Sequence, residues 1–295
     1  MPPTTRLRLD IAYDGTGFSG WAKQPGLRTV QGELEAALAT VLRRSGPPPT
    51  LTVAGRTDVG VHAIGQVAHV DLTEAQLAAL DRPHRDSPPG PKGPDALTRR
   101  LNGIAGLSSD VVVARTTIAP EGFDARFSAL WRRYEYRIAD AAAVRDPRRR
   151  AETLWHPARL DLDAMNEAAR ELIGLHDFAA YCKPRPGATT IRMLQRFDWT
   201  RDDAGVITAH LQADAFCHSM VRSLVGASVA VGQAKLEPAR VGELKKATSR
   251  SSEFVVMPAK GLTLVEVGYP PDAELAARAE LTRARRGLTE DGGID

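Results

Sequence analysis

The chain carries the same order of hydrophobic patterns twice, and this repetition restricts its fold more than any other feature. In the first half, alternating apolar residues over 7–13 predict a strand, and helically spaced apolar residues after Thr29 predict a helix that Thr29 caps. The remaining elements of this half are expected at 51–54 (strand), 66–72 (strand), 95–104 (helix) and 111–117 (strand). The resulting order, β-α-β-β-α-β, is that of a split β-α-β unit.

The second half repeats that order. Its strands are expected at 131–138, 191–200, 206–213 and 262–267, and its helices at 162–173 and 218–231. Two such halves predict an α+β protein of two ferredoxin-like split β-α-β halves, whose antiparallel sheets join into one larger sheet with helices on one side and a central cleft. The expected divisions of the chain are 1–120, 121–272 and a tail at 273–295, which we expect to be a short helix or a flexible segment.

The composition is that of an ordinary globular protein, with 43% hydrophobic and 25% charged residues among 295. No apolar run approaches the roughly 20 residues that cross a bilayer, and no secretory signal opens the chain, so we expect no membrane segment.

Cys182 and Cys217 form no CxxC pair, and we expect both to be free, buried residues in a reducing cytoplasm. Proline and glycine crowd residues 82–94, which we expect to form an exposed loop.

Positive charge is concentrated in one segment although the net charge is only +3. Between Arg126 and Arg150 there are eight arginines and three acidic residues, and Trp131, Tyr134 and Tyr136 lie among them. Guanidinium groups bind phosphates and flat rings stack on bases, which favours a nucleic-acid contact. A solvated strand whose arginine stems cover apolar surface explains the same pattern, and this alternative remains open.

The loop from Gly55 to Gly60 has the highest density of chemically useful side chains. It follows a predicted strand, and its two glycines permit a sharp bend that holds the Asp58 carboxylate outward. Arg56 and Thr57 can position phosphate or sugar oxygens beside that carboxylate. The alternative is an ordinary turn in which Asp58 bonds only its own backbone.

A metal site is a competing interpretation of this region. Asp58, His62, His69 and Asp71 are ligand types that zinc or iron accepts. However, a bend separates His62 from Asp58, and neither a helical ligand spacing nor a further cysteine or histidine cluster accompanies them. We therefore expect no metal.

Two further side chains are candidates for the same site. Arg222 interrupts an otherwise apolar helix, where an unpaired charge is costly, and Asp58 is the obvious partner for it. Tyr134 lies on one face of its strand, and its ring can stack on a base that has left its helix. The alternative is that Tyr134 and Tyr136 are both core residues.

These stretches, taken in order, resemble the TruA-type tRNA pseudouridine synthases. The resemblance covers residues 5 to 270 and is carried by Tyr13-Asp14-Gly15-Thr16-Gly17-Phe18, Gly55-Arg56-Thr57-Asp58-Val59-Gly60, Arg126-Phe127-Ser128-Ala129, Arg133-Tyr134-Glu135-Tyr136, His218-Ser219-Met220-Val221-Arg222 and Pro258-Ala259-Lys260-Gly261-Leu262. The Gly-Arg-Thr-Asp loop and the Met-Val-Arg helix are specific as a pair. Val59 departs from the family's usual alanine, which adds bulk beside the loop.

The resemblance implies a homodimeric cytoplasmic enzyme without cofactor or metal. It would isomerise uridine to pseudouridine in the anticodon stem-loop of tRNA, around positions 38–40. By the same resemblance Asp58 is the catalytic carboxylate, Tyr134 stacks on the target uracil, Arg222 pairs with Asp58, and Arg56 lies near the flipped nucleotide. Thr57, Arg126 and Arg133 are further candidates for substrate contacts.

The reaction suits these side chains because uracil is detached from its sugar, rotated and reattached through carbon, without a redox change. Attack by Asp58 on the sugar C1′ and attack on the base C6 both remain open, as does removal of the last proton by Tyr134 or by Asp58. Two other functions compete with this hypothesis. A tRNA-folding chaperone would use the same basic cleft without catalysis, and a hydrolase would use Asp58, His62 and His69 with a metal.

Overall fold

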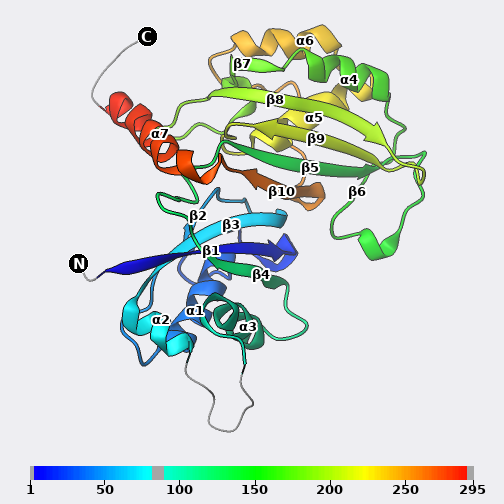
Figure 1. The fold of residues 1–295 in the computed structure, drawn as a ribbon. Helices are drawn as coiled ribbons and strands as arrows, with labels where there is room; N and C mark the ends of the chain where they lie inside the picture. Colours follow the sequence, from blue (N-terminus) through cyan, green and yellow to red (C-terminus); the bar gives the residue numbers. More distant parts are fainter. Residues whose placement is uncertain (1–2, 82–89, 291–295) are drawn as a thin grey trace. The chain divides into compact units, whose positions relative to one another are not determined.

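The computed structural model describes residues 3–81 and 90–290 of the chain, which form two compact units (Figure 1). The first unit contains Met1–Ala129 together with Tyr269–Leu288, and the second contains Leu130–Gly268. Each unit contains antiparallel strands together with helices, so the α+β class is confirmed. The expectation that the two sheets join at a cleft concerns the relation between the units and stays a prediction.

The sheet of the first unit has the strand order β4-β1-β3-β2. The central strand β1 pairs antiparallel with β3 on one side and with β4 on the other, and β2 pairs with β3. The bounds are β1 (Thr4–Tyr13), β2 (Thr52–Val53), β3 (His62–Thr73) and β4 (Val111–Ile118), and the helices are α1 (Val30–Leu42), α2 (Glu74–Leu80), α3 (Gly93–Ala105) and α7 (Leu275–Glu290). This strand order is that of a split β-α-β unit, as the sequence predicts.

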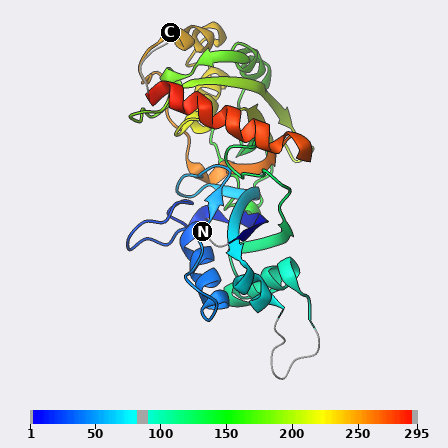
Figure 2. The same ribbon diagram turned by 60° about the vertical axis from the view of Figure 1, so that its left-hand side comes forward.

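Side-chain alternation explains why β1 lies at the centre of this sheet. Leu7, Leu9 and Ile11 are at most 1% exposed, and the charged Arg8 between them is only half-buried. Figure 2 shows α1 and α3 together on one face of this sheet. Helix α1 begins where the Thr29 hydroxyl accepts a hydrogen bond from the Gly32 N–H at 3.2 Å. The predicted cap and helix are therefore confirmed.

The sheet of the second unit has the strand order β10-β5-β9-β8-β7, with every neighbouring pair antiparallel. The short strand β6 runs parallel to β5 and pairs with its C-terminal end. The strands are β5 (Trp131–Ala139), β6 (Leu154–Trp155), β7 (Gly174–Asp177), β8 (Ile191–Arg201), β9 (Ile207–Ala213) and β10 (Leu262–Gly268), and the helices are α4 (Leu162–Arg170), α5 (Met220–Gly232) and α6 (Pro238–Glu243).

Helix α5 is the most deeply buried helix described, with eleven of its thirteen residues buried. It follows Ser219, whose φ of 65° turns the chain into the helix. A methyl group at Gly226 would lie 2.0 Å from the Val255 carbonyl oxygen, so only glycine lets the segment around Val255 lie against α5. This contact fixes the helix that carries Arg222.

Several predicted elements differ from the structure. Helices α2 and α6 and strands β6 and β7 were not predicted. Helix α2 begins in a capping box formed by Thr73 and Gln76. The predicted loop at 82–94 is wrong at its end because α3 begins at Gly93, and residues 82–89 lie outside the described residues. The tail after Asp272, expected to be a short helix or a flexible segment, contains the helix α7, and the divisions at 120 and 272 stay a prediction.

The expectation that both cysteines are free is wrong. Cys182 and Cys217 form a disulfide, with their Cα atoms 5.8 Å apart. Their separation of 35 residues in the sequence gives no pairing signal. The fold brings them together because the Lys183 N–H donates to the His218 carbonyl at 3.0 Å, which aligns the two segments.

Of the helices in the described ranges, none combines the length and the apolar character of a membrane span.

Candidate active site

The Asp58 loop, residues 54–61, leaves β2 and is held from both sides by the segment that follows β1. The Trp21 N–H donates to the Thr57 carbonyl at 3.1 Å, and the Gly60 N–H donates to the Phe18 carbonyl at 3.3 Å. Inside the loop, the Val61 N–H donates to the Asp58 carbonyl at 3.2 Å. The backbone itself therefore closes the turn that presents Asp58.

Two glycines make this close approach possible. A methyl group at Gly15 would lie 2.0 Å from the Val61 carbonyl oxygen. Gly20 has a φ of +90°, and a methyl group there would lie 3.0 Å from the Thr57 carbonyl oxygen. Since no other residue fits at Gly15 without moving the loop, the position of Asp58 depends on backbone packing.

A buried hydrogen-bond chain supports the loop from below. The Tyr13 hydroxyl lies 2.8 Å from the Thr57 hydroxyl, and the Gln66 amide donates to the Tyr13 oxygen at 3.2 Å and to the Gly55 carbonyl at 2.9 Å. Burial raises the pKa of Tyr13 to about 12, against the opposing effect of Thr57 and Gln66, so its hydroxyl stays protonated. From the sequence, Tyr13 and Gln66 were expected only as strand or motif residues. Each is a polar residue at a strand position whose side chain points into the core, and this pattern could have indicated their role.

The charged side chains of the loop lie at different depths. Arg56 is exposed, Asp58 is half-buried, and Val59 beside them is 63% exposed. Thr57 is 6% exposed because it bonds Tyr13. The loop therefore presents a carboxylate and a guanidinium group outward from a buried support.

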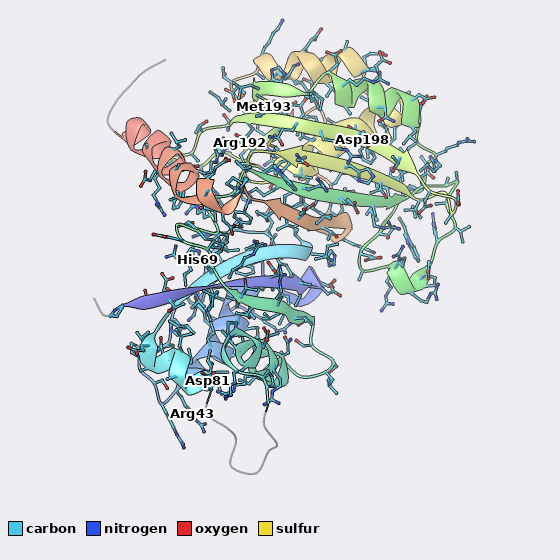
Figure 3. All side chains as sticks on the ribbon, viewed as in Figure 1. Arg43, His69, Asp81, Arg192, Met193 and Asp198 are labelled. Atoms are coloured by element: carbon cyan, nitrogen blue, oxygen red, sulfur yellow. A yellow bond between two sulfur atoms is a disulfide. The ribbon has the colours of Figure 1, made fainter. Side chains whose placement is uncertain are left out.

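The histidines of the metal hypothesis are engaged with backbone groups. The Gly15 N–H donates to Nδ1 of His62 at 3.1 Å, and the Ala125 N–H donates to Nδ1 of His69 at 3.0 Å. Burial and the charge of Arg6 lower the pKa of His69, labelled on β3 in Figure 3, to about 4. In residues 3–81 and 90–290, no three side chains of His, Cys, Asp or Glu are grouped as ligands of one ion.

Tyr134 lies on the helix-facing side of β5 in the second unit. It is 9% exposed, and its ring packs edge-on against Phe216 with the centroids 5.2 Å apart. Tyr136 is fully buried, and its hydroxyl donates to the Pro258 carbonyl at 2.8 Å. The two tyrosines share a face as predicted, but only Tyr134 keeps part of its surface accessible.

Arg222 lies in the first turn of α5 and is half-buried. Its Nε donates to the Met257 carbonyl at 2.6 Å, and its own carbonyl accepts the Met257 N–H at 3.1 Å. These two hydrogen bonds, together with the close contact at Gly226, restrict where the guanidinium group can lie.

The two other predicted arginines have different environments. Arg133 lies on the face of β5 opposite to Tyr134, where it bonds Gln212 and pairs with Glu266 at 2.9 Å. Arg126 belongs to the first unit, and its guanidinium lies over the Phe127 ring, 5.3 Å from the centroid. Within the second unit, Arg133 and Tyr134 therefore do not converge on one face.

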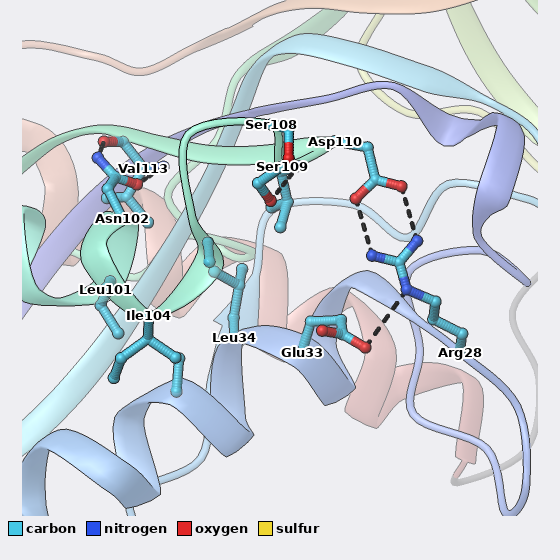
Figure 4. A pocket seen from close by; sticks show the side chains of 13 residues that line it. Arg28, Glu33, Leu34, Leu101, Asn102, Ile104, Ser108, Ser109, Asp110 and Val113 are labelled. Carbon is cyan, nitrogen blue, oxygen red and sulfur yellow. Dashed lines mark hydrogen bonds and ion pairs between the residues drawn. The ribbon is translucent and has the colours of Figure 1, made fainter.

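A separate pocket of about 370 Å³ lies in the first unit between α1, α3 and β4 (Figure 4). Its lining includes no residue of the Asp58 loop. Arg28 spans its rim and binds both Asp110 oxygens, at 2.6 and 2.8 Å, while the Asn102 amide bridges to the Val113 backbone. Because these polar groups already bond one another, we assign the pocket no part in the candidate site.

Comparison with known proteins gives strong matches. A sequence model of a family described as "tRNA pseudouridine synthase" matches residues 168–270. A "tRNA pseudouridine synthase A" from Leifsonia xyli is 63% identical over 96% of this chain and 98% of its own length. Proteins of the same name from Streptomyces griseus and Mycobacterium leprae are 54% and 52% identical, over 99% and 95% of this chain and 97% and 95% of their own lengths.

The similarity of this chain to solved structures is weak. A chain described in "Structure of H/ACA RNP bound to a substrate RNA containing 2'-deoxyuridine" is 12% identical and matches 96% of this chain and 57% of its own length, with a TM-score of 0.32. The sequence relatives, which match over nearly the full length, decide the assignment. This chain belongs to the tRNA pseudouridine synthase A family.

Proposed function

We propose that this chain isomerises uridine to pseudouridine in tRNA and that Asp58 is the catalytic carboxylate. Family membership over 96% of the chain supports the isomerase activity. The observation that supports the role of Asp58 is its place on a loop braced by Gly15, Gly20 and the Tyr13 hydroxyl. A reactive group needs such a fixed position because small displacements lower the rate strongly.

The reaction requires balanced bond changes at one nucleotide. The bond between uracil N1 and the sugar C1′ breaks, a bond between C5 and C1′ forms, C5 loses its proton, and N1 gains one. Asp58 attacks either C1′ or C6, and it or Tyr134 takes the C5 proton. No electron is gained or lost overall, so these groups are sufficient without a redox partner.

Tyr134, Arg222 and Arg56 have supporting roles in this proposal. The accessible part of the Tyr134 ring stacks on the target uracil, and Phe216 supports its edge. Arg222 forms an ion pair with Asp58 that keeps the carboxylate ionised. Arg56, exposed on the Asp58 loop, binds the backbone of the flipped nucleotide.

Three further residues, Arg126, Thr57 and Arg133, contribute to substrate binding in this proposal. Arg126 provides charge to the substrate, and Thr57 acts mainly through the loop because its hydroxyl bonds Tyr13. Arg133 contacts RNA only where its pairing with Glu266 and Gln212 leaves donors available. We further propose that the substrate is the anticodon stem-loop around positions 38–40, and that the enzyme acts in the cytoplasm as a homodimer.

Release of tritium from C5 of uridine in unmodified tRNA tests the proposal. Wild type, Asp58→Ala and Asp58→Asn are assayed in parallel, each with and without EDTA, and tRNA affinity is measured for each. Release by wild type alone, with similar affinities, supports isomerisation through Asp58 without a metal. Tight binding without release from any tRNA would favour the folding chaperone, and loss of wild-type activity in EDTA would favour the metal-dependent hydrolase.

The role of Arg222 is tested separately, because a half-buried arginine also affects stability. Arg222→Met is expected to lower both the melting temperature and the rate, since it removes the proposed partner of Asp58. Arg222→Lys keeps the charge but loses the Nε–Met257 hydrogen bond, and it is expected to recover part of the rate. Unchanged melting and unchanged rate in Arg222→Met would exclude the pair.

A further inference from the structure

Trp155 is an unusual residue of the second unit because it is large, aromatic and 38% exposed. It lies on β6, the two-residue strand that pairs with β5 through the registers Ile138 to Leu154 and Ala139 to Trp155. Since β10 pairs with β5 only as far as Tyr136, β6 occupies the next place along that strand. The indole is therefore attached to the sheet by backbone hydrogen bonding while part of its ring faces solvent.

Two cations from different parts of the chain lie over this ring. The Arg145 guanidinium carbon is 5.6 Å from the ring centroid, and the Lys260 ammonium nitrogen is 6.0 Å from it. Arg145 comes from the loop after β5, and Lys260 comes from the 3-10 turn Ala259–Gly261 before β10. Cation–π attraction holds both charges beside the exposed indole.

The loop that carries Arg145 is well anchored. Asp140, which is fully buried, accepts hydrogen bonds from the N–H groups of Ala142 and Leu160 at 3.0 and 2.9 Å and from Arg201 at 2.9 Å. The Val144 N–H then donates to the Ala204 carbonyl at 2.9 Å. Arg145 is thus presented from a fixed backbone, which lowers the entropy cost of binding a ligand.

The local charge balance favours an anionic ligand. The nearest acids are already paired, Asp146 with Arg148 at 2.8 Å and Glu152 with Arg149 at 2.9 Å. Arg145 itself is exposed, and among the described residues no carboxylate pairs with it. The surface beside Trp155 therefore keeps a net positive charge.

From these observations we propose that Trp155, Arg145 and Lys260, here called the Trp155 platform, bind the substrate RNA outside the group of residues that react with uridine. An unpaired base stacks on the exposed part of the indole, and the flanking phosphates contact the cations. A single aromatic ring surrounded by cations fits RNA better than it fits a protein partner, which would require a wider apolar patch. This inference rests on the proposed function in one respect, that the ligand is tRNA.

Affinity for unmodified tRNA, measured by filter binding at several salt concentrations, tests the platform. Trp155→Leu keeps apolar volume but removes the flat ring, and it is expected to weaken binding about 10-fold. Trp155→Phe keeps a ring and is expected to bind within about 3-fold of wild type. Arg145→Ala is expected to reduce the slope of log affinity against log salt by about 0.7 to 0.9 for each phosphate that the variant no longer neutralises.

Val144→Ala is the matched control, because Val144 is 72% exposed and lies next to Arg145 in the same loop. It is expected to bind tRNA like wild type. The rate at saturating tRNA is expected to stay unchanged in Trp155→Leu while KM rises, provided that far-ultraviolet circular dichroism and melting match wild type. Those two measurements separate a loss of stacking from a folding defect.

The outcomes separate this inference from the proposed function. Wild-type affinity in both Trp155→Leu and Arg145→Ala would overturn the platform, whatever the enzyme catalyses. Equal weakening in Trp155→Leu and Trp155→Phe would overturn base stacking as its mode of binding. Weakened binding in Trp155→Leu together with no tritium release by wild type would overturn the isomerase proposal and leave the platform supported.

Discussion

The two units have the same strand order but carry different side chains on it. In the first unit, β4-β1-β3-β2 supports a glycine-braced loop that presents one carboxylate, Asp58. In the second unit, the corresponding order β10-β5-β9-β8 carries rings and cations, with Tyr134 on β5 and Arg222 on α5. A shared fold therefore says little about which chemistry each copy supports, because that depends on the side chains placed at its ends.

The strongest way to test this division is to remove the carboxylate alone. Asp58→Asn is nearly the same size as aspartate but cannot act as nucleophile or base, so we expect the rate to fall by at least about 10³-fold. Melting temperature and tRNA affinity should stay close to wild type. Single-turnover pseudouridine formation measures the effect, and a residual rate within about 10-fold of wild type would contradict the assignment of Asp58.

The second comparison concerns how tightly each unit holds its functional element. Gly15→Ala and Gly226→Ala each place a methyl group 2.0 Å from a backbone oxygen, of Val61 and Val255 respectively. We expect each to lower the free energy of unfolding by about 2 to 3 kcal/mol. Denaturant unfolding measures this decrease. Gly103→Ala, which has open space around it on α3, is the control and should not destabilise.

The two units are also expected to respond differently to acid. Burial lowers the pKa of His69 in the first unit to about 4, below the ordinary value near 6.5. The unfolded chain therefore binds a proton that the folded unit excludes, so stability falls as pH drops from about 6.5 to about 4, by at most about 3 kcal/mol. His69→Asn can keep an acceptor for the Ala125 N–H but does not titrate in this range. The free energy of unfolding of this variant should therefore depend less on pH than that of wild type.

In the second unit, Asp140 makes the stability depend on pH over a lower pH range. Burial alone would raise its pKa, but hydrogen bonds from Arg201, Leu160 and Ala142 outweigh burial and lower it to about 2. Its contribution to stability is present above the ordinary pKa near 3.8 and is lost as pH falls toward 2. When the pH is lowered from 7 to 4.5, hydrogen exchange should therefore show a larger loss of amide protection in the first unit than in the second. Equal changes in protection in the two units would contradict this order.

The smallest expected effect tests the hydrogen-bond chain beneath the Asp58 loop. Tyr13→Phe removes the hydroxyl that bonds Thr57 and Gln66, and we expect a stability decrease of about 1 kcal/mol. If the chain positions Asp58, kcat should also fall about 10-fold with little change in KM. Tyr181→Phe in the second unit removes a buried bond to the Val241 carbonyl and should lower stability without lowering kcat. An unchanged kcat in Tyr13→Phe would make the chain purely structural.

Local patterns were sufficient to predict most of the elements. The alternation along β1, the Thr29 cap of α1 and the bend at Gly60, whose φ is 76°, all depend on residues near one another in the chain, and each is present in the structure. The short helix α2 was missed because its apolar residues occupy only seven positions, too few for a clear helical period.

What the sequence by itself determined was the order of the main elements and the α+β class, because these follow from local periodicity, while the reactive side chains that it singles out stay a proposal. Only the tertiary structure decided that Tyr13 and Gln66 support Thr57 and that Cys182 bonds Cys217, whereas the opposite orientation of Arg133 and Tyr134 follows from strand alternation. Each of these joins residues far apart in the chain or depends on the face that a strand buries. Such pairings are selected by packing, which no local pattern contains.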